Sequence, residues 1–224
     1  MPGLADMRRD LPRLLAGAPD AVISHRGPIA QGLLDDSRSA IVLHLSAATA
    51  MSGHADVKTL LTGVEDALHL GADAVSVHVS FGVAEETSML AAAGLVAAGC
   101  TEWGVPLLVM AYVVGSSPSL ESGKVAHAAR VSAELGADIV KVPYTGSPES
   151  FAAVVSSCFV PIVMAGGSKT PWADVLTDVR DAISAGAHGV CIGRNVFQRA
   201  DPAAALGELR AAVHGQPAKV LTHA

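Results

Sequence analysis

The chain has 224 residues, of which 50% are hydrophobic and 4% aromatic, so it is long enough to bury one large core. Its formal net charge is −6 and it has no stripe of lysine and arginine, which argues against nucleic acid or an anionic membrane as the main partner and favours a small-molecule ligand. Cys100, Cys158 and Cys191 lie far apart without metal-ligand spacing, so we expect small buried thiols in a reducing cytoplasm. The longest apolar runs are too short to span a bilayer.

In chain order, a helical pattern opens the sequence over residues 4–17, and short apolar runs then alternate with longer helical patterns. A phrase recurs as "PDAVISH" at 19, "ADAVSVH" at 72, "ADIVKV" at 137 and "AHGVCIG" at 187, which indicates an internal repeat of βα units around a parallel sheet. The predicted strands cover 21–26, 40–46, 74–80, 106–112, 139–144, 161–165 and 189–193. The predicted helices cover 57–70, 84–101, 121–135, 148–157, 171–186 and 201–214.

The alternation of residues along these strands predicts which side of each strand faces inward. In "AVSVHVS" (74–80) one face carries only valine, and the other carries serine and His78. In "AIVLHLS" (40–46) one face carries isoleucine and leucine, and the other carries His44. A strand covered by helices needs an apolar outer face, so the polar set must point into an interior lined by the other strands. We therefore predict an α/β fold of the TIM (β/α)8-barrel type, in one domain over residues 1–224, with seven strands counted.

Lys141 stands in the middle of the apolar run "GADIVKVPYTG", and the repeat aligns it with Ser76, so we expect it to point into the barrel. A partly desolvated ammonium has a lowered pKa, and the resulting neutral amine is a nucleophile that forms Schiff bases with carbonyl substrates. The iminium then withdraws electrons, so that a neighbouring C–C bond is broken or formed. A lysine paired with an interior carboxylate, or one that binds phosphate, is the alternative interpretation.

Two glycine-bearing strand ends, "VMAGGSKT" (163–170) and "VCIGRN" (190–195), follow the last two predicted strands. In an eight-stranded α/β barrel these loops commonly bind a phosphate through backbone N–H groups. The residues predicted to do so are Gly166, Gly167, Gly193 and Arg194, with Lys169 either assisting or lying at the surface. An ordinary tight turn is the alternative for the paired glycines.

Tyr112 ends the predicted strand "PLLVMAY" on the same face as Leu108 and Met110, so it is expected to point inward at the carboxyl end, where active sites of this architecture lie. A phenol beside a Schiff base can donate and remove protons during dehydration and C–C cleavage. An aromatic plug of the barrel mouth is the alternative. For His44 and His78, a hydrogen-bonded core histidine is as reasonable an interpretation as a catalytic one, and no metal site is predicted.

These segments carry a resemblance that covers nearly the whole chain. "IVLHLSAATA", "GADAVSVHVSFG", "WGVPLLVMAY", "GADIVKVPYTGSPESF", "VMAGGSKT" and "AGAHGVCIGRNVFQ" resemble the class I aldolases of the archaeal-type fructose-bisphosphate aldolase and 2-amino-3,7-dideoxy-D-threo-hept-6-ulosonate synthase family. The resemblance implies a TIM barrel, no metal or other cofactor, a Schiff-base lysine at Lys141, a proton-transferring tyrosine at Tyr112 and phosphate held by the "GG" and "GR" loops. It also implies a homo-oligomer. The "HLSA" and "SVHV" segments are more similar to the synthase branch, which joins aspartate semialdehyde to a fragment of a phosphorylated ketose.

The chain also departs from this family. "YVVG" stands where the family usually has "YPRG", and "KVPYTGS" replaces a "KT-x-YTGD" pattern. The family begins with a strand ending in "MDHG", whose aspartate takes part in proton transfer, and that strand is missing from this sequence. We expect either a strained seven-stranded barrel or a cleft beside the first and last strands, and reduced activity.

Three functions follow from these features. The first is a Schiff-base aldolase or transaldolase acting on a phosphorylated keto-sugar, in aromatic amino-acid biosynthesis for the synthase branch, or else as a fructose-bisphosphate aldolase. The second is a non-catalytic barrel that binds a phosphorylated sugar. The third is an isomerase or synthase that uses the phosphate site with other chemistry, which Lys141 and Tyr112 disfavour.

Overall fold

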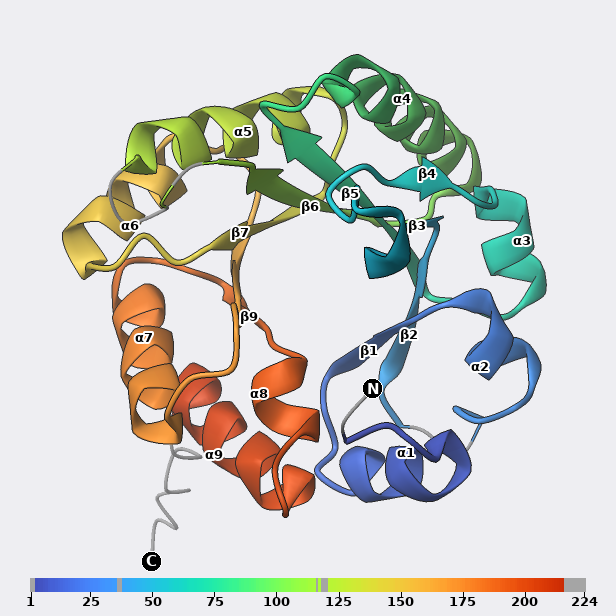
Figure 1. Cartoon of the computed structure of the whole chain (residues 1–224), viewed down its shortest axis with the longest axis vertical. Helices are drawn as coiled ribbons and strands as arrows, with labels where there is room; N and C mark the ends of the chain where they lie inside the picture. Colours follow the sequence, from blue (N-terminus) through green and yellow to red (C-terminus); the bar gives the residue numbers. More distant parts are fainter. Residues whose placement is uncertain (1–2, 36–37, 116, 118–120, 216–224) are drawn as a thin grey trace, which may run out of the picture.

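The computed structural model describes residues 3–35, 38–115, 117 and 121–215. Its main sheet contains seven parallel strands in the order β1-β2-β5-β6-β7-β8-β9, and Figure 1 shows how the sheet curls within a layer of helices. The strands are β1 (Ala21–Ser24), β2 (Ala40–His44), β5 (Ala74–Phe81), β6 (Leu107–Val113), β7 (Ile139–Pro143), β8 (Ile162–Ala165) and β9 (Gly189–Cys191). The seven predicted strands and the α/β fold are confirmed.

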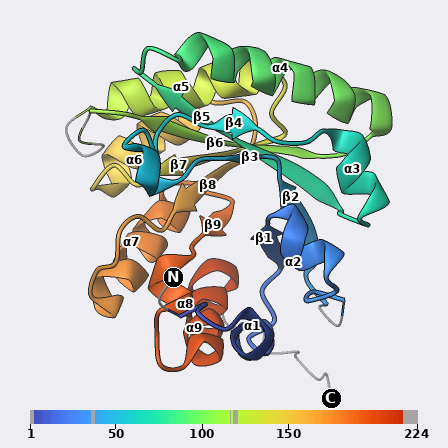
Figure 2. The ribbon, with the colours of Figure 1, turned by 45° about the vertical axis from the view of Figure 1, so that its right-hand side comes forward.

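Helices connect these strands and cover the outer face of the sheet, as Figure 2 shows from a second direction. The longer ones are α1 (Met7–Leu15), α4 (Glu86–Trp103), α5 (Ser122–Glu134), α6 (Pro148–Ser156), α7 (Trp172–Ser184) and α9 (Pro202–His214). The shorter ones are α2 (Arg26–Ala30), α3 (Val64–His69), α8 (Arg194–Phe197) and the 3-10 turn η1 (Ala50–Ser52). The short helices α2 and α8 begin just after β1 and β9, where the sequence pattern predicted none.

The helix predicted over 57–70 is wrong in its first half, because only α3 is helical there. Residues Thr59–Leu60 form strand β4, which pairs antiparallel with β3 (Ser46–Ala47) above the carboxyl end of β2. The pairing joins segments that are more than ten residues apart, and such a contact overrides local helix preference. The pairing of β3 with β4 holds the loop between these two strands over the interior, where Ser80 donates a hydrogen bond to the backbone oxygen of Asp56.

The predicted inward and outward faces are confirmed. The valine face of β5 is buried in the core, with Val75, Val77 and Val79 at 0 to 2% exposure. The serine and histidine face looks inward, where His44 of β2 hydrogen bonds to Ser76 of β5. Strand alternation therefore delivers polar side chains to the interior of the curled sheet while the helices cover its apolar face.

The sheet does not close. Within the described residues β1 and β9 each pair with one strand only, so of the two predicted alternatives the structure shows the cleft and not the strained closed barrel. A cavity of about 600 Å³ runs from the interior through the space between these two edges. Apolar side chains of β1, β9, α1, α8 and α9 line its outer part, including those of Leu11, Ile23 and Leu209.

The internal repeat has a structural role at the amino ends of the strands. Asp73, just before β5, accepts a hydrogen bond from the backbone N–H of Ile41 in β2, at 2.7 Å. Asp138, just before β7, accepts one from Leu107 in β6, at 2.8 Å. Each carboxylate thus binds a backbone N–H at the start of the preceding strand in the sheet, which helps to set the register of the interior residues.

We expect Asp138→Ala to lower the free energy of unfolding by about 1 kcal/mol, because the N–H of Leu107 loses its carboxylate acceptor. Urea denaturation measures this loss. Glu134→Ala is the matched control, since Glu134 forms an exposed ion pair with Arg130 on α5 and surface pairs contribute little. Equal effects of the two substitutions would contradict the proposed role of Asp138.

Candidate active site

Lys141 lies inside the curled sheet, as the repeat predicted. The strand registers place it beside Met110 of β6, which in turn pairs with His78 of β5. The Lys141 Nζ lies 4.0 Å from the Met110 sulfur. The amine is therefore surrounded by the interior side chains of several strands at the level where the substrate of a barrel enzyme would react.

Tyr112 lies two residues nearer the carboxyl end of β6 than Met110, and its ring stacks on that of His78. Their ring centroids lie 5.0 Å apart with an interplanar angle of 6°. The Nε2 of His78 is 3.0 Å from the hydroxyl of Ser80, which itself donates to the backbone oxygen of Asp56. Because the imidazole is held on one edge by this chain of hydrogen bonds, its face fixes the plane of the Tyr112 phenol.

Burial is the main cause that lowers the pKa of both interior histidines. The pKa of His44 falls to about 3, with His25 as the next cause, and the pKa of His78 falls to about 4, with Lys58 as the next cause. Both imidazoles are consequently neutral near pH 7. The Nδ1 of His44 is bonded to the Ser76 hydroxyl at 2.9 Å, so the structure shows a hydrogen-bonded histidine, consistent with either of the two interpretations of the sequence.

The expected lowering of the Lys141 pKa is wrong. Burial does lower it, but the negative charges that Cys191 and Tyr112 carry when ionised, and the hydrogen bonds that they would accept from the ammonium, raise it above the ordinary value. The pKa of Lys141 depends on which groups surround the amine in the folded chain, and neither Cys191 nor Tyr112 is close to Lys141 in sequence. The ammonium is thus the stable form, and a proton must be removed before the amine can react.

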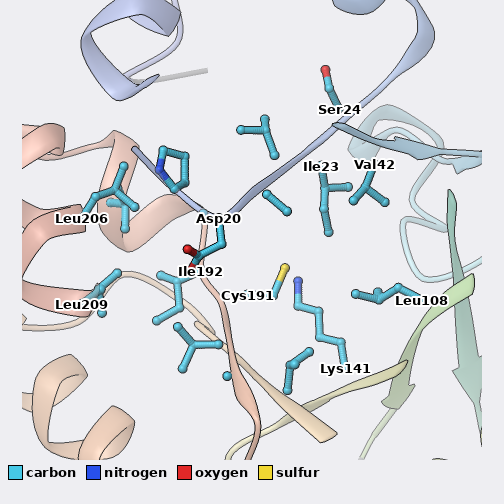
Figure 3. Close-up of a pocket in the computed structure, with 18 of the residues that line it drawn as sticks. Asp20, Ile23, Ser24, Val42, Leu108, Lys141, Cys191, Ile192, Leu206 and Leu209 are labelled. Carbon is cyan, nitrogen blue, oxygen red and sulfur yellow. The ribbon is translucent and has the colours of Figure 1, made fainter. Parts of the chain in front are cut away.

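Cys191 is the interior residue that sequence reasoning missed. It was expected to be a small buried thiol, as was Cys158, but both are only half-buried. Figure 3 shows the Cys191 sulfur and the Lys141 nitrogen near one another in the cavity between the sheet edges. The alternation along β9 carries the signal that would have found it, since Cys191 lies on the same side of its strand as Gly189 and Gly193.

The two glycine loops meet at the ends of β8 and β9. Arg194 donates a hydrogen bond to the backbone oxygen of Gly167 at 3.0 Å. A side chain at Gly166 would lie 2.6 Å from Ile192, so packing requires that glycine, and Gly167 has a φ of +62°, which favours glycine. Lys169 is exposed, in agreement with one of its two predicted positions.

Asn195 joins these loops and was not predicted. Its amide donates to the backbone oxygens of Gly166 and Ser168, and its oxygen accepts from the N–H of Thr170. The side chain is 3% exposed. The buried amide therefore fixes the shape of the loop that follows β8. Among the described residues no group of three or more His, Cys, Asp or Glu side chains is placed to hold a metal ion.

The depressed histidine pKa values predict how stability depends on pH. The unfolded chain takes up protons near pH 6.5, whereas folded His44 and His78 resist protonation until about pH 3 to 4. The free energy of unfolding should therefore fall as the pH drops below about 6.5, by up to about 1.4 kcal/mol per pH unit for each imidazole. Urea denaturation across this window measures the slope, and the double substitution His44→Gln with His78→Gln should flatten it. An unchanged slope would contradict the assignment.

Comparisons with known proteins identify the family of the chain. Residues 2–199 match the family model described as DeoC/LacD family aldolase. The chain is 44% identical over 197 residues to 2-amino-3,7-dideoxy-D-threo-hept-6-ulosonate synthase 1 of Archaeoglobus fulgidus, covering 88% of this chain and 74% of that one. It is 38% identical to 2-amino-4,5-dihydroxy-6-oxo-7-(phosphonooxy)heptanoate synthase of Streptomyces griseus, covering 87% and 73%.

A solved structure shares the fold. An archaeal fructose-1,6-bisphosphate aldolase, whose catalytic lysine is covalently bound to the carbinolamine intermediate of its substrate, superposes with a TM-score of 0.86 at 30% identity, covering 94% of this chain and 85% of that one. No described helix of this chain has the length and apolar character needed to cross a membrane. The family match over most of the chain is decisive: this protein belongs to the DeoC/LacD family of aldolases.

Proposed function

We propose that Lys141 is the Schiff-base nucleophile of a class I aldolase that joins a phosphorylated keto-sugar fragment to an aldehyde, most like the hept-6-ulosonate synthases. One observation carries the proposal: in the described part of the chain no carboxylate pairs with the Lys141 amine, whose neighbours are Met110, Tyr112 and Cys191. A structural lysine at this depth would need a carboxylate partner, because burial of an unpaired charge is costly.

The neighbours of Lys141 fit the proton transfers that such a reaction needs. The amine adds to the substrate carbonyl after losing its proton, and the resulting carbinolamine loses water to give the iminium. Tyr112 is the group proposed to donate and accept these protons, since it is close enough to Lys141 to be one cause of the raised pKa of the amine. The stacked ring of His78 would hold the phenol in the plane required for that transfer.

The phosphate is proposed to bind where the loops after β8 and β9 meet. Backbone N–H groups of Gly166, Gly167 and Gly193 would supply neutral donors, and the exposed Arg194 guanidinium would add a charge-assisted contact. The buried amide of Asn195 supports this proposal, because it holds the first loop against the second.

Aspartate semialdehyde is the proposed aldehyde partner, by similarity to the synthase relatives. Copies of the chain are proposed to associate, since two sheet edges are unpaired among the described residues.

Borohydride reduction in the presence of dihydroxyacetone phosphate should add a stable adduct to Lys141, because reduction fixes the iminium. Peptide mass spectrometry locates the adduct. Lys141→Arg should abolish trapping, since a guanidinium keeps its proton and cannot attack the carbonyl. Lys124→Arg is the matched control, because Lys124 forms a surface ion pair with Glu121. An adduct on a different lysine in the native chain would overturn the assignment.

Arg194→Ala should weaken the binding of phosphorylated ligands by about 1.5–3 kcal/mol, the range for a hydrogen bond to a charged group. Isothermal titration with inorganic phosphate and with dihydroxyacetone phosphate measures this change. Arg180→Ala, an exposed position on α7, is the control and should leave the affinity unchanged. If both variants bind phosphate as the native chain does, the anion site lies elsewhere.

A further inference from the structure

The cavity between β1 and β9 holds two nucleophiles that face one another. Lys141 and Cys191 both line it, and Figure 3 shows the sulfur and the amine nitrogen near each other in that view. The thiol is also close enough to influence the pKa of the amine. The aldol chemistry proposed for Lys141 uses the amine and the phenol of Tyr112, and it leaves the thiol without a role.

The sheet register explains why these two side chains meet. Lys141 pairs with Val163 of β8, and Cys191 pairs with Ala165 of the same strand, two residues nearer the carboxyl end. All four side chains are on the inner side of the sheet. Because Ala165 is small, the long stem of the lysine can rise past it to the level of the thiol. The contact is thus set by backbone pairing across three neighbouring strands.

The other two thiols are in different environments. Cys100 is buried in α4, and burial followed by the charge of Asp138 raises its pKa to about 11. Cys158 lies 3.8 Å from the backbone oxygen of Ala129, to which it donates. Neither is among the residues that line the cavity around Lys141. A thiolate is the form that reacts with oxidants, so a thiol in a cavity beside an ammonium is the one that is exposed to this chemistry.

We propose that Cys191 is a peroxide-sensitive modification site whose oxidised sulfur bonds to the amine of Lys141 and reversibly blocks the active site. The inference rests on the proposed function in one respect: the amine that is blocked is the one assigned to Schiff-base formation. The co-reactants are a peroxide, which oxidises the sulfur, and a low-molecular-weight thiol, which reverses the bond.

Each step balances. Cys–SH and H2O2 give Cys–SOH and water, so sulfur is oxidised as the peroxide O–O bond is reduced. The neutral Lys141 amine then attacks the sulfenic sulfur, forming an S–N bond and releasing a second water. A thiol RSH cleaves that bond to give Cys–SSR and the free amine, and a second RSH releases Cys–SH with RSSR. While the S–N bond exists, the Lys141 nitrogen is held by the sulfur and is no longer the primary amine that forms a Schiff base with a carbonyl.

The test measures two properties of the full chain after treatment with hydrogen peroxide. The first is borohydride trapping with dihydroxyacetone phosphate, which should be lost on oxidation and restored by dithiothreitol. The second is the peptide map, which should contain a cross-link between the β7 and β9 peptides that is lighter than the sum of the two by two hydrogen atoms. Cys158→Ala is the matched control and should behave as the native chain does.

Cys191→Ala and Cys191→Ser should keep trapping after peroxide, since neither side chain forms a sulfenic acid. If both variants lose trapping as the native chain does, or if the oxidised native chain contains no such cross-link, the proposal is overturned. A reduced native chain that is never trapped at Lys141 would instead overturn the proposed function. Peptide mass detects the cross-link without any trapping reaction. The Cys191 site can therefore still be tested if Lys141 is never trapped.

Discussion

The site depends on how the interior of an apolar sheet holds the ammonium of Lys141. Burial disfavours the charge, yet the pKa of the group is raised, because Cys191 and Tyr112 are close enough to offer hydrogen bonds and negative charge. No carboxylate among the described residues neutralises it permanently. The ammonium is therefore stabilised by Cys191 and Tyr112, a thiol and a phenol that can each exchange a proton. Protons can thus move to and from the amine without a rearrangement of the fold.

Much of this arrangement could be predicted from the pattern of residues. Alternation along a strand is a local property, so the inward positions of His78, Tyr112 and Lys141 follow from the sequence once the strands are located. The family resemblance extended the prediction to the chemistry, and the comparisons support the same class of enzyme. The seven strands were located correctly because each is a short apolar run that begins after a small-residue loop.

The features that sequence reasoning missed all depend on contacts between distant segments. Strand β4 forms because Thr59–Leu60 meets Ser46–Ala47, and no property of residues 57–63 alone reveals that pairing. The pKa of Lys141 depends on the distance from the amine to Cys191 and Tyr112 rather than on burial alone. The same limit applies to Asn195, whose buried amide is recognisable only when the loop after β8 is seen folded around it.

Asp20 precedes β1 in the same repeat position as Asp73 and Asp138, but it has different partners. It accepts from Arg210 and His214 at the end of α9, so side chains at one rim join the two ends of the described chain. Figures 1 and 2 both place α1 beside α9 at this rim. Exposed ion pairs thus join the residue before β1 to α9 at this rim, in addition to the packing of α1 against α9. Added salt screens these pairs, so they are the contacts near the two sheet edges whose strength varies with ionic strength.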